Sequence, residues 1–82
     1  MLRFAEPATV DPAAKAVGDR VKAEMERQSI RQRAVAKRLG MSQGAVSRRI
    51  VGAVPFDVAE LEKLARLLDV PATYFLTDGV AA

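Results

Sequence analysis

QRAVAKRLGMSQGAVSRRIV, residues 32–51, carries the clearest structural pattern in this chain of 82 residues. We predict a helix over 32–39, ended by Gly40, because glycine adopts the left-handed backbone that closes a helix at little cost. A second helix is expected after Ser42, whose side chain can cap it, and it runs to about residue 51. The apolar side chains available to pack these helices against the rest of the chain are Val35, Leu39, Met41, Val46 and Ile50.

The segments on either side of this pair also carry helical signals. Asp11-Pro12 resembles an N-cap followed by the first helical residue, and apolar residues recur at every fourth position up to about Gln28. Asp57, with a glutamate three residues later, is a variant capping box that opens a helix ending near Leu68. A last short helix is predicted to start at Pro71. We find no strand candidate and therefore predict an all-α chain of five helices.

Length and composition indicate one domain. Half of the residues are hydrophobic, with four prolines, five glycines and no repetitive polar run, which favours a folded domain over a disordered chain. We expect residues 11–77 to form this domain. Residues 1–10 lack a clear hydrophobic period, and we interpret them as an N-terminal arm that can be flexible. Residues 78–82 are interpreted as a short tail.

The net charge of +3 conceals an uneven distribution. Seven basic residues and no acidic residue lie between Arg27 and Phe56, whereas the rest of the chain has six basic and ten acidic residues. A positive segment in an otherwise acidic molecule is typical of a protein that binds a polyanion such as nucleic acid. A solvated helical face is the simpler interpretation of the same charges.

A resemblance to a known family rests on several positions spread over 30–76. They are Gln32, Ala36, the LGMSQ run over 39–43, Val46, Ser47, Gly52 and the tail ELEKLARLLDVPATYFL. With these residues the stretch resembles the Cro/phage-repressor (XRE-like) helix-turn-helix family. The resemblance implies a compact lambda-repressor-like domain and a sequence-specific transcriptional regulator, of the phage or bacterial repressor or Cro type, that binds a double-stranded DNA operator.

In that family the helix over 43–51 enters the major groove, and residues near its start read the bases. Carried over by position, the candidate base contacts are Gln43, Gly44, Ser47 and Arg48. The helical period independently places these four residues on one face, opposite Val46. Arg48 could form a bidentate contact with guanine and Gln43 one with adenine, whereas Gly44 offers only a close backbone approach.

Contacts to DNA phosphates are expected from the preceding helix and from the ends of the recognition helix. The candidates are Gln32, Arg31, Arg33, Lys37, Arg38, Ser42 and Arg49. The resemblance assigns Gln32 a second role, supporting the base-reading side chain of Gln43. Two departures from the family's pattern are a basic residue at Arg49, where relatives are often apolar, and an apolar Ile50 facing Met25, where relatives often have an ion pair.

Composition argues against several other functions. Without cysteine or histidine, the Ser-His-Asp and Cys-His sites and the commonest metal ligands are missing, and no glycine-rich phosphate loop is present. Glu24 and Glu26 are two residues apart on a helix and so do not form a carboxylate pair. We therefore expect no enzyme, cofactor, metal or small-molecule substrate. No apolar run is long enough for a membrane span, so we expect a cytoplasmic protein, nucleoid-associated when bound to DNA.

The alternative functions differ from operator binding in the molecule that the chain would bind. An antitoxin-like or adaptor protein would bind mainly another protein, but only the short arm and tail could wrap around one. RNA binding is weaker still, because four aromatic residues do not make a stacking platform. A homodimer on two half-sites would use the last helix, with Tyr74, Phe75 and Leu76, or Leu2 and Phe4 of the arm. The simpler interpretation is that these aromatic residues close the core.

Overall fold

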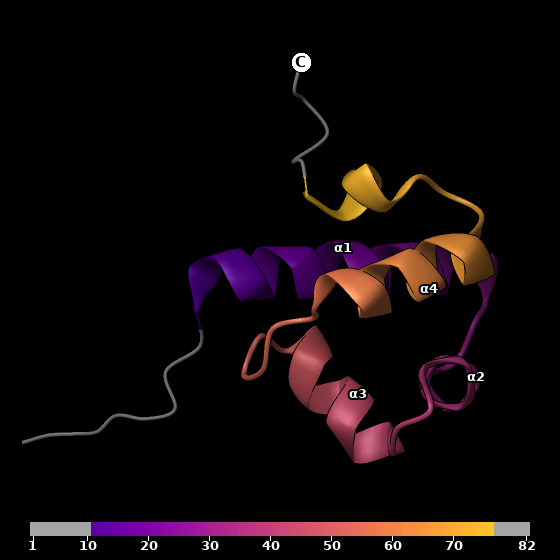
Figure 1. Ribbon diagram of the computed structural model, residues 1–82, viewed down its shortest axis with the longest axis horizontal. Coiled ribbons are helices and arrows are strands. Elements are labelled where there is room, and N and C mark those ends of the chain that lie inside the picture. Colours follow the sequence, from indigo (N-terminus) through magenta and orange to yellow (C-terminus); the bar gives the residue numbers. More distant parts are fainter. Residues whose placement is uncertain (1–10, 77–82) are drawn as a thin grey trace, which may run out of the picture.

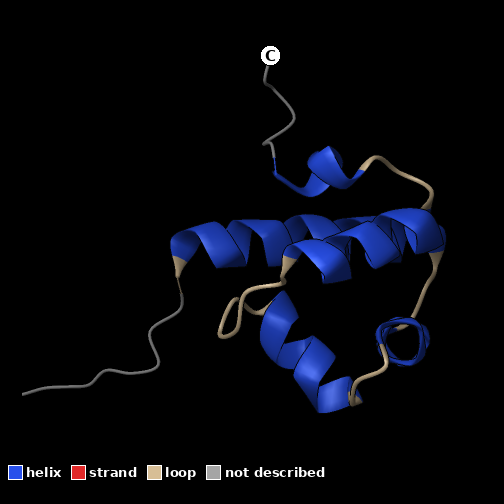
Figure 2. Cartoon of the chain, viewed as in Figure 1, coloured by secondary structure: helices blue, strands red, loops and turns tan. Residues whose placement is uncertain are grey.

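Four α-helices and one 3₁₀ helix make up the computed structural model over residues 11–76, which are the residues that the structure describes. The elements are α1 (Pro12–Gln28), α2 (Gln32–Leu39), α3 (Gln43–Ile50), α4 (Val58–Leu68) and the 3₁₀ helix η1 (Ala72–Leu76). This part of the chain contains no strand (Figure 2). The predicted all-α fold is confirmed. The arm at 1–10 and the tail at 78–82 lie outside the described residues.

Local side-chain chemistry starts α1, α3 and α4 as predicted. The Asp11 carboxylate accepts a hydrogen bond from the amide of Ala13 at 2.9 Å, and the Ser42 hydroxyl accepts one from the amide of Ala45 at 3.0 Å. At the start of α4, Asp57 and Glu60 form a complete capping box. Because each bond satisfies an amide that the helix leaves without a partner, the caps set where these helices begin.

The last element, predicted as a short helix starting at Pro71, is a 3₁₀ helix over Ala72–Leu76. Its amide at Tyr74 donates to the carbonyl of Pro71 at 2.9 Å, the three-residue step of a 3₁₀ turn. Five residues are too few to stabilise an α-helix alone. The element is held instead by the buried side chain of Phe75, whose carbonyl also accepts from the Arg20 guanidinium at 3.2 Å.

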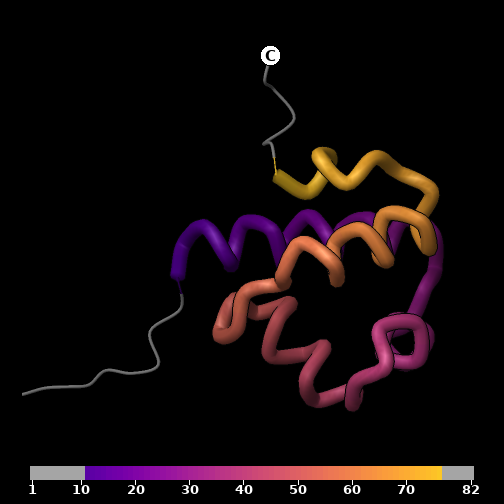
Figure 3. Tube along the Cα trace, in the orientation of Figure 1, coloured from indigo at the N-terminus to yellow at the C-terminus, as the bar shows by residue number. Residues whose placement is uncertain are grey.

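Three layers can be followed in Figure 1, where α1 and α4 lie side by side across the middle of the molecule. η1 packs on one side of this pair, and α2 and α3 pack on the other. The trace in Figure 3 shows that the short turn between α2 and α3 lies at the edge farthest from η1. The pair of helices with the basic residues therefore forms one end of the molecule.

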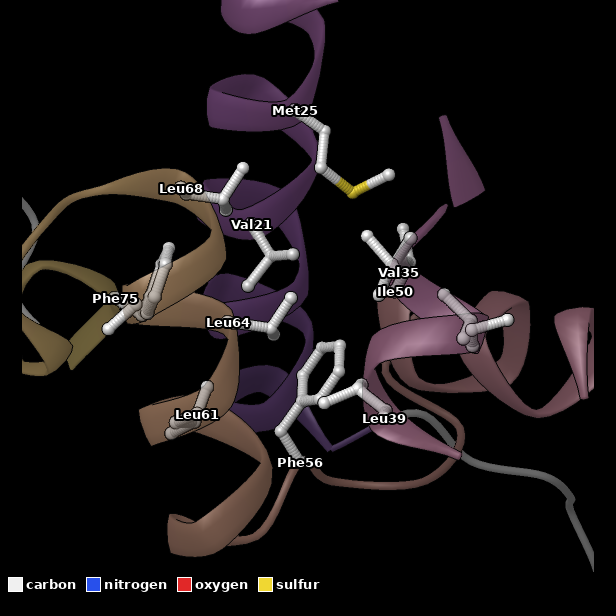
Figure 4. Close-up of a cluster of buried hydrophobic side chains, with 13 residues drawn as sticks. Val21, Met25, Val35, Leu39, Ile50, Phe56, Leu61, Leu64, Leu68 and Phe75 are labelled. Atoms are coloured by element: carbon white, nitrogen blue, oxygen red, sulfur yellow. The ribbon is translucent and has the colours of Figure 1, made fainter. Parts of the chain in front are cut away.

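One hydrophobic core joins all of these elements (Figure 4). Its completely buried side chains are those of Phe75, Leu64, Leu68, Val21, Val35 and Val46. Met25 extends from α1 toward Val35 and Ile50, and both Met25 and Ile50 are buried. The expected apolar contact thus replaces the ion pair of the family pattern. No helix in the described part of the chain is long and apolar enough to cross a membrane.

Candidate nucleic-acid interface

The outer face of α3 carries the four residues predicted to read bases. Gln43, Gly44 and Arg48 are exposed and Ser47 is half-buried, whereas Val46 and Ile50 on the opposite face are buried. The core therefore holds α3 by one side and leaves the other side free over its whole length. This geometry is what insertion into a groove requires, and the base contacts themselves stay a prediction.

Gly44 is not required by the fold. A Cβ atom added there would lie 3.6 Å from a guanidinium nitrogen of Arg48 and 3.9 Å from the Ser42 hydroxyl oxygen, which are ordinary contacts. Its backbone torsion does not fall in the left-handed range that favours glycine, unlike that of Gly40 in the preceding turn, with φ of 69°. Nothing within residues 11–76 therefore explains the missing side chain, which is compatible with a close approach by an external partner.

Five exposed cations lie between the N-cap of α2 and the last turn of α3. None of them forms an ion pair with another residue in 11–76; they are Arg31, Arg33, Lys37, Arg38 and Arg48. Salt bridges elsewhere engage Lys15, Arg27 and Arg49. Because the five charges lack acidic neighbours, they are available for an external polyanion, whose binding they would favour most strongly at low ionic strength.

The start of α2 lies next to these cations. Arg31 occupies its N-cap position, and no side chain caps this helix. Gln32 is half-buried, and no hydrogen bond joins it to Gln43 in the described part of the chain. Its predicted role in supporting Gln43 therefore stays a prediction for the DNA-bound state. The uncapped amides at this helix end offer donors to an anion such as phosphate.

The far end of α3 is fixed to α1 by two glycines, of which Gly52 belongs to the predicted pattern and Gly18 does not. A Cβ atom at Gly18 would lie 2.1 Å from the carbonyl oxygen of Ile50, and one at Gly52 would lie 2.7 Å from the Cα atom of Lys15. Gly52 also has a φ of 87°, where other residues are strained. Backbone packing on backbone thus sets the position of α3. A glycine inside a helical pattern was the available signal for Gly18.

Arg49 points away from the base-facing side and engages α4. Its Nε donates to Glu60 at 3.1 Å, and a terminal nitrogen donates to the carbonyl of Ala45 at 3.1 Å. The side chains of Arg49 and Glu60 are only 19% and 16% exposed. The predicted phosphate contact of Arg49 stays a prediction, but the guanidinium already has two acceptors within the protein.

A buried carboxylate on α1, Glu24, links this helix to η1 on the side of the molecule away from α3. The side chain is 2% exposed and accepts hydrogen bonds from Arg27, from the Gln28 amide at 2.6 Å and from the Tyr74 hydroxyl at 3.2 Å. Gln28 also donates to the carbonyl of Leu68 at 2.6 Å. The hydrogen bond from Arg27, followed by that from Gln28, lowers the pKa of Glu24 to about 2, against the effect of burial.

The sequence pattern raised Glu24 only as a potential catalytic partner of Glu26. It did not predict that Glu24 links α1 to η1. Arg27, three residues further on the same helix, was a weak local signal for it. The described residues contain no group of three His, Cys, Asp or Glu side chains that could hold a metal ion.

The comparisons with known proteins agree with this geometry. The family model described as Helix-turn-helix matches residues 21–75, which extend from the middle of α1 to η1 and include the whole surface described above. Neither the curated proteins nor the solved structures gave a match.

Proposed function

The chain belongs to the XRE-type helix-turn-helix family of DNA-binding regulatory domains, and on that premise we propose that it is a sequence-specific transcriptional regulator of the repressor or Cro kind. In this proposal α3 lies in the major groove of a double-stranded operator. The observation that carries it is the exposed outer face of α3, together with five exposed cations between residues 31 and 48 that have no ion-pair partner within 11–76.

Base reading is assigned to the exposed side of α3. Arg48 has the two donors for a bidentate contact with guanine, Gln43 has the donor and the acceptor for one with adenine, and Ser47 can donate or accept. Gly44 would let the helix backbone come close to the groove. Only two long polar side chains are available on this face, so we expect a short recognition sequence in each half-site.

Phosphate binding is assigned to α2, its N-cap and the N-cap of α3. The proposed contacts are Arg31, Gln32, Arg33, Lys37, Arg38 and Ser42. The hydroxyl oxygen of Ser42 caps α3, which leaves the hydroxyl hydrogen free to donate. Such contacts set the register of the protein on the duplex without reading its sequence.

A homodimer on two half-sites is a further part of the proposal. The predicted interface residues differ in their exposure. Phe75 is completely buried in the core and is therefore unavailable to a partner, whereas Tyr74 and Leu76 are exposed. Among the described residues of the predicted interface, these two are the ones that a second copy could contact. Leu2 and Phe4 lie outside the described residues.

Selection of bound duplexes from a random-sequence DNA library at near-physiological salt tests the proposal. We expect an enriched motif, and two inverted copies at a fixed spacing if the protein binds as a dimer. Binding without any enriched motif would contradict sequence-specific regulation and would favour a role in which the main partner is another protein.

Paired substitutions separate base readers from phosphate contacts. Arg48→Ala should cost about 1–3 kcal/mol at one base position and relax selectivity there, since a bidentate contact is lost. Lys37→Ala should weaken binding to all sequences alike and reduce the salt-dependence slope by about one. Titrations of motif and scrambled duplexes at several salt concentrations measure both effects. Lys63→Ala, an exposed lysine on α4, is the control; equal behaviour of all three variants would refute the assignment.

A further inference from the structure

A single ion pair in the described part of the chain joins two different helices, and it joins α3 to α4. The other two, Lys15–Asp19 and Arg27–Glu24, lie within α1. The backbones of α3 and α4 do not contact each other, because α3 packs on α1 and α2. The Arg49–Glu60 pair therefore bridges two elements that the backbone packing leaves apart.

Both partners of this bridge are themselves held in place. One oxygen of Glu60 accepts from the amide of Asp57 at 3.0 Å, as part of the capping box, and from Nε of Arg49 at 3.1 Å. The Arg49 guanidinium also donates to the carbonyl of Ala45, one turn back along α3. The start of α4 is thus linked by continuous hydrogen bonds to the turn of α3 that contains Gly44 and Arg48.

We propose that Arg49 and Glu60 are positioning residues that set the orientation of α3 for base reading, so that specificity depends on a side chain facing away from the DNA. The proposal rests on the proposed function. Because the pair is largely buried, solvent ions screen the attraction between its charges less than in an exposed ion pair. Its side chains are also more restricted in geometry. Arg49 would thereby act on the bases through Arg48 and Gln43 and would not bind phosphate.

Glu60→Gln gives opposite results under the two roles of Arg49. Glutamine can still close the capping box, so the start of α4 is retained. If Arg49 binds phosphate, removing the negative charge that holds the guanidinium should strengthen binding to every duplex and steepen the salt dependence. If Arg49 positions α3, affinity for the selected motif should fall roughly tenfold, while affinity for scrambled DNA stays unchanged or rises.

Further variants complete the test. Glu62→Gln removes the same charge from an exposed position on α4 and should leave selectivity unchanged. Arg49→Met keeps the aliphatic stem and should lower selectivity as Glu60→Gln does, with an unchanged salt slope. The double variant Arg49→Met/Glu60→Gln should be no worse than Arg49→Met, because both substitutions act on the same interaction.

The outcomes distinguish this proposal from the function on which it rests. Wild-type protein that selects no motif overturns the proposed function. Selective wild-type protein with a Glu60→Gln variant that keeps its selectivity overturns the positioning role alone, as would a reduced salt slope in Arg49→Met. Circular dichroism melting of each variant establishes that binding is measured on folded protein.

Discussion

Gly18→Ala is expected to lower the free energy of unfolding by about 2–3 kcal/mol, a large fraction of the stability of a small domain. The added methyl group would lie 2.1 Å from the carbonyl oxygen of Ile50 and 2.9 Å from that of Arg49. Both atoms belong to the backbone, so no side-chain rotation relieves the overlap and α1 must move away from α3. The gain of about 1 kcal/mol in helix propensity offsets only part of this cost.

The same substitution on α3 provides the control. Gly44→Ala adds a methyl group where the nearest atoms are 3.6 Å away, so it should raise the free energy of unfolding by about 0.5–1 kcal/mol. Urea titrations followed by circular dichroism measure both variants. A Gly18→Ala protein as stable as the wild type would show that α1 and α3 are not in backbone contact.

These two variants should also differ in DNA binding. Gly18→Ala displaces the end of α3, whereas Gly44→Ala leaves the fold intact and adds bulk to the face proposed to approach the bases. A Gly44→Ala protein that is more stable but binds its motif more weakly would support a close approach at this residue. Unchanged binding would show that the groove has room for a side chain there.

Acid should destabilise the protein chiefly between about pH 4.5 and pH 2, because the pKa of Glu24 falls from its ordinary value of 4.5 to about 2 in the folded state. A carboxylate whose pKa is depressed by folding contributes its full stabilisation above its unfolded pKa. That contribution declines as the pH falls toward the folded pKa, where the buried group is protonated. The contacts with Arg27, Gln28 and Tyr74 then weaken, and η1 loses one of its links to α1.

Glu24→Gln removes the titrating group and retains an acceptor. This variant should be less stable than the wild type at pH 7 and should lose less stability between pH 4.5 and pH 2. Glu26→Gln, an exposed change on the same helix, should keep the wild-type pH profile. Urea midpoints measured across this range give the comparison. Identical profiles for Glu24→Gln and the wild type would show that Glu24 does not carry this acid sensitivity.

Two sides of α1 thus hold different elements of the fold. Toward η1 and the end of α4, the helix carries the Glu24 network, which holds the last element on the core. Toward α3, it carries Gly18, which sets the backbone contact below the recognition surface. We expect changes at Glu24 to act mainly through the folded fraction, and changes at Arg49 or Glu60 to act mainly through base selectivity.

Helix boundaries and the outward face of α3 could be predicted from the sequence because both depend on neighbouring residues. A cap bonds an amide two or three residues away, a glycine ends a helix by its own torsion, and the helical period places Gln43 and Arg48 opposite Val46. The basic segment between Arg27 and Phe56 was likewise visible as charge along the chain. These local features determined the fold class and the candidate interface.

Tertiary structure alone decided how α3 is held. Gly18 meets Ile50, Glu24 meets Tyr74 and Arg49 meets Glu60 across separations that no local pattern reports. In the sequence, these residues are a glycine with a poor helix propensity, an unpaired carboxylate and a candidate phosphate contact. Their roles depend on distances between elements, which packing of the core sets only when the whole domain has folded.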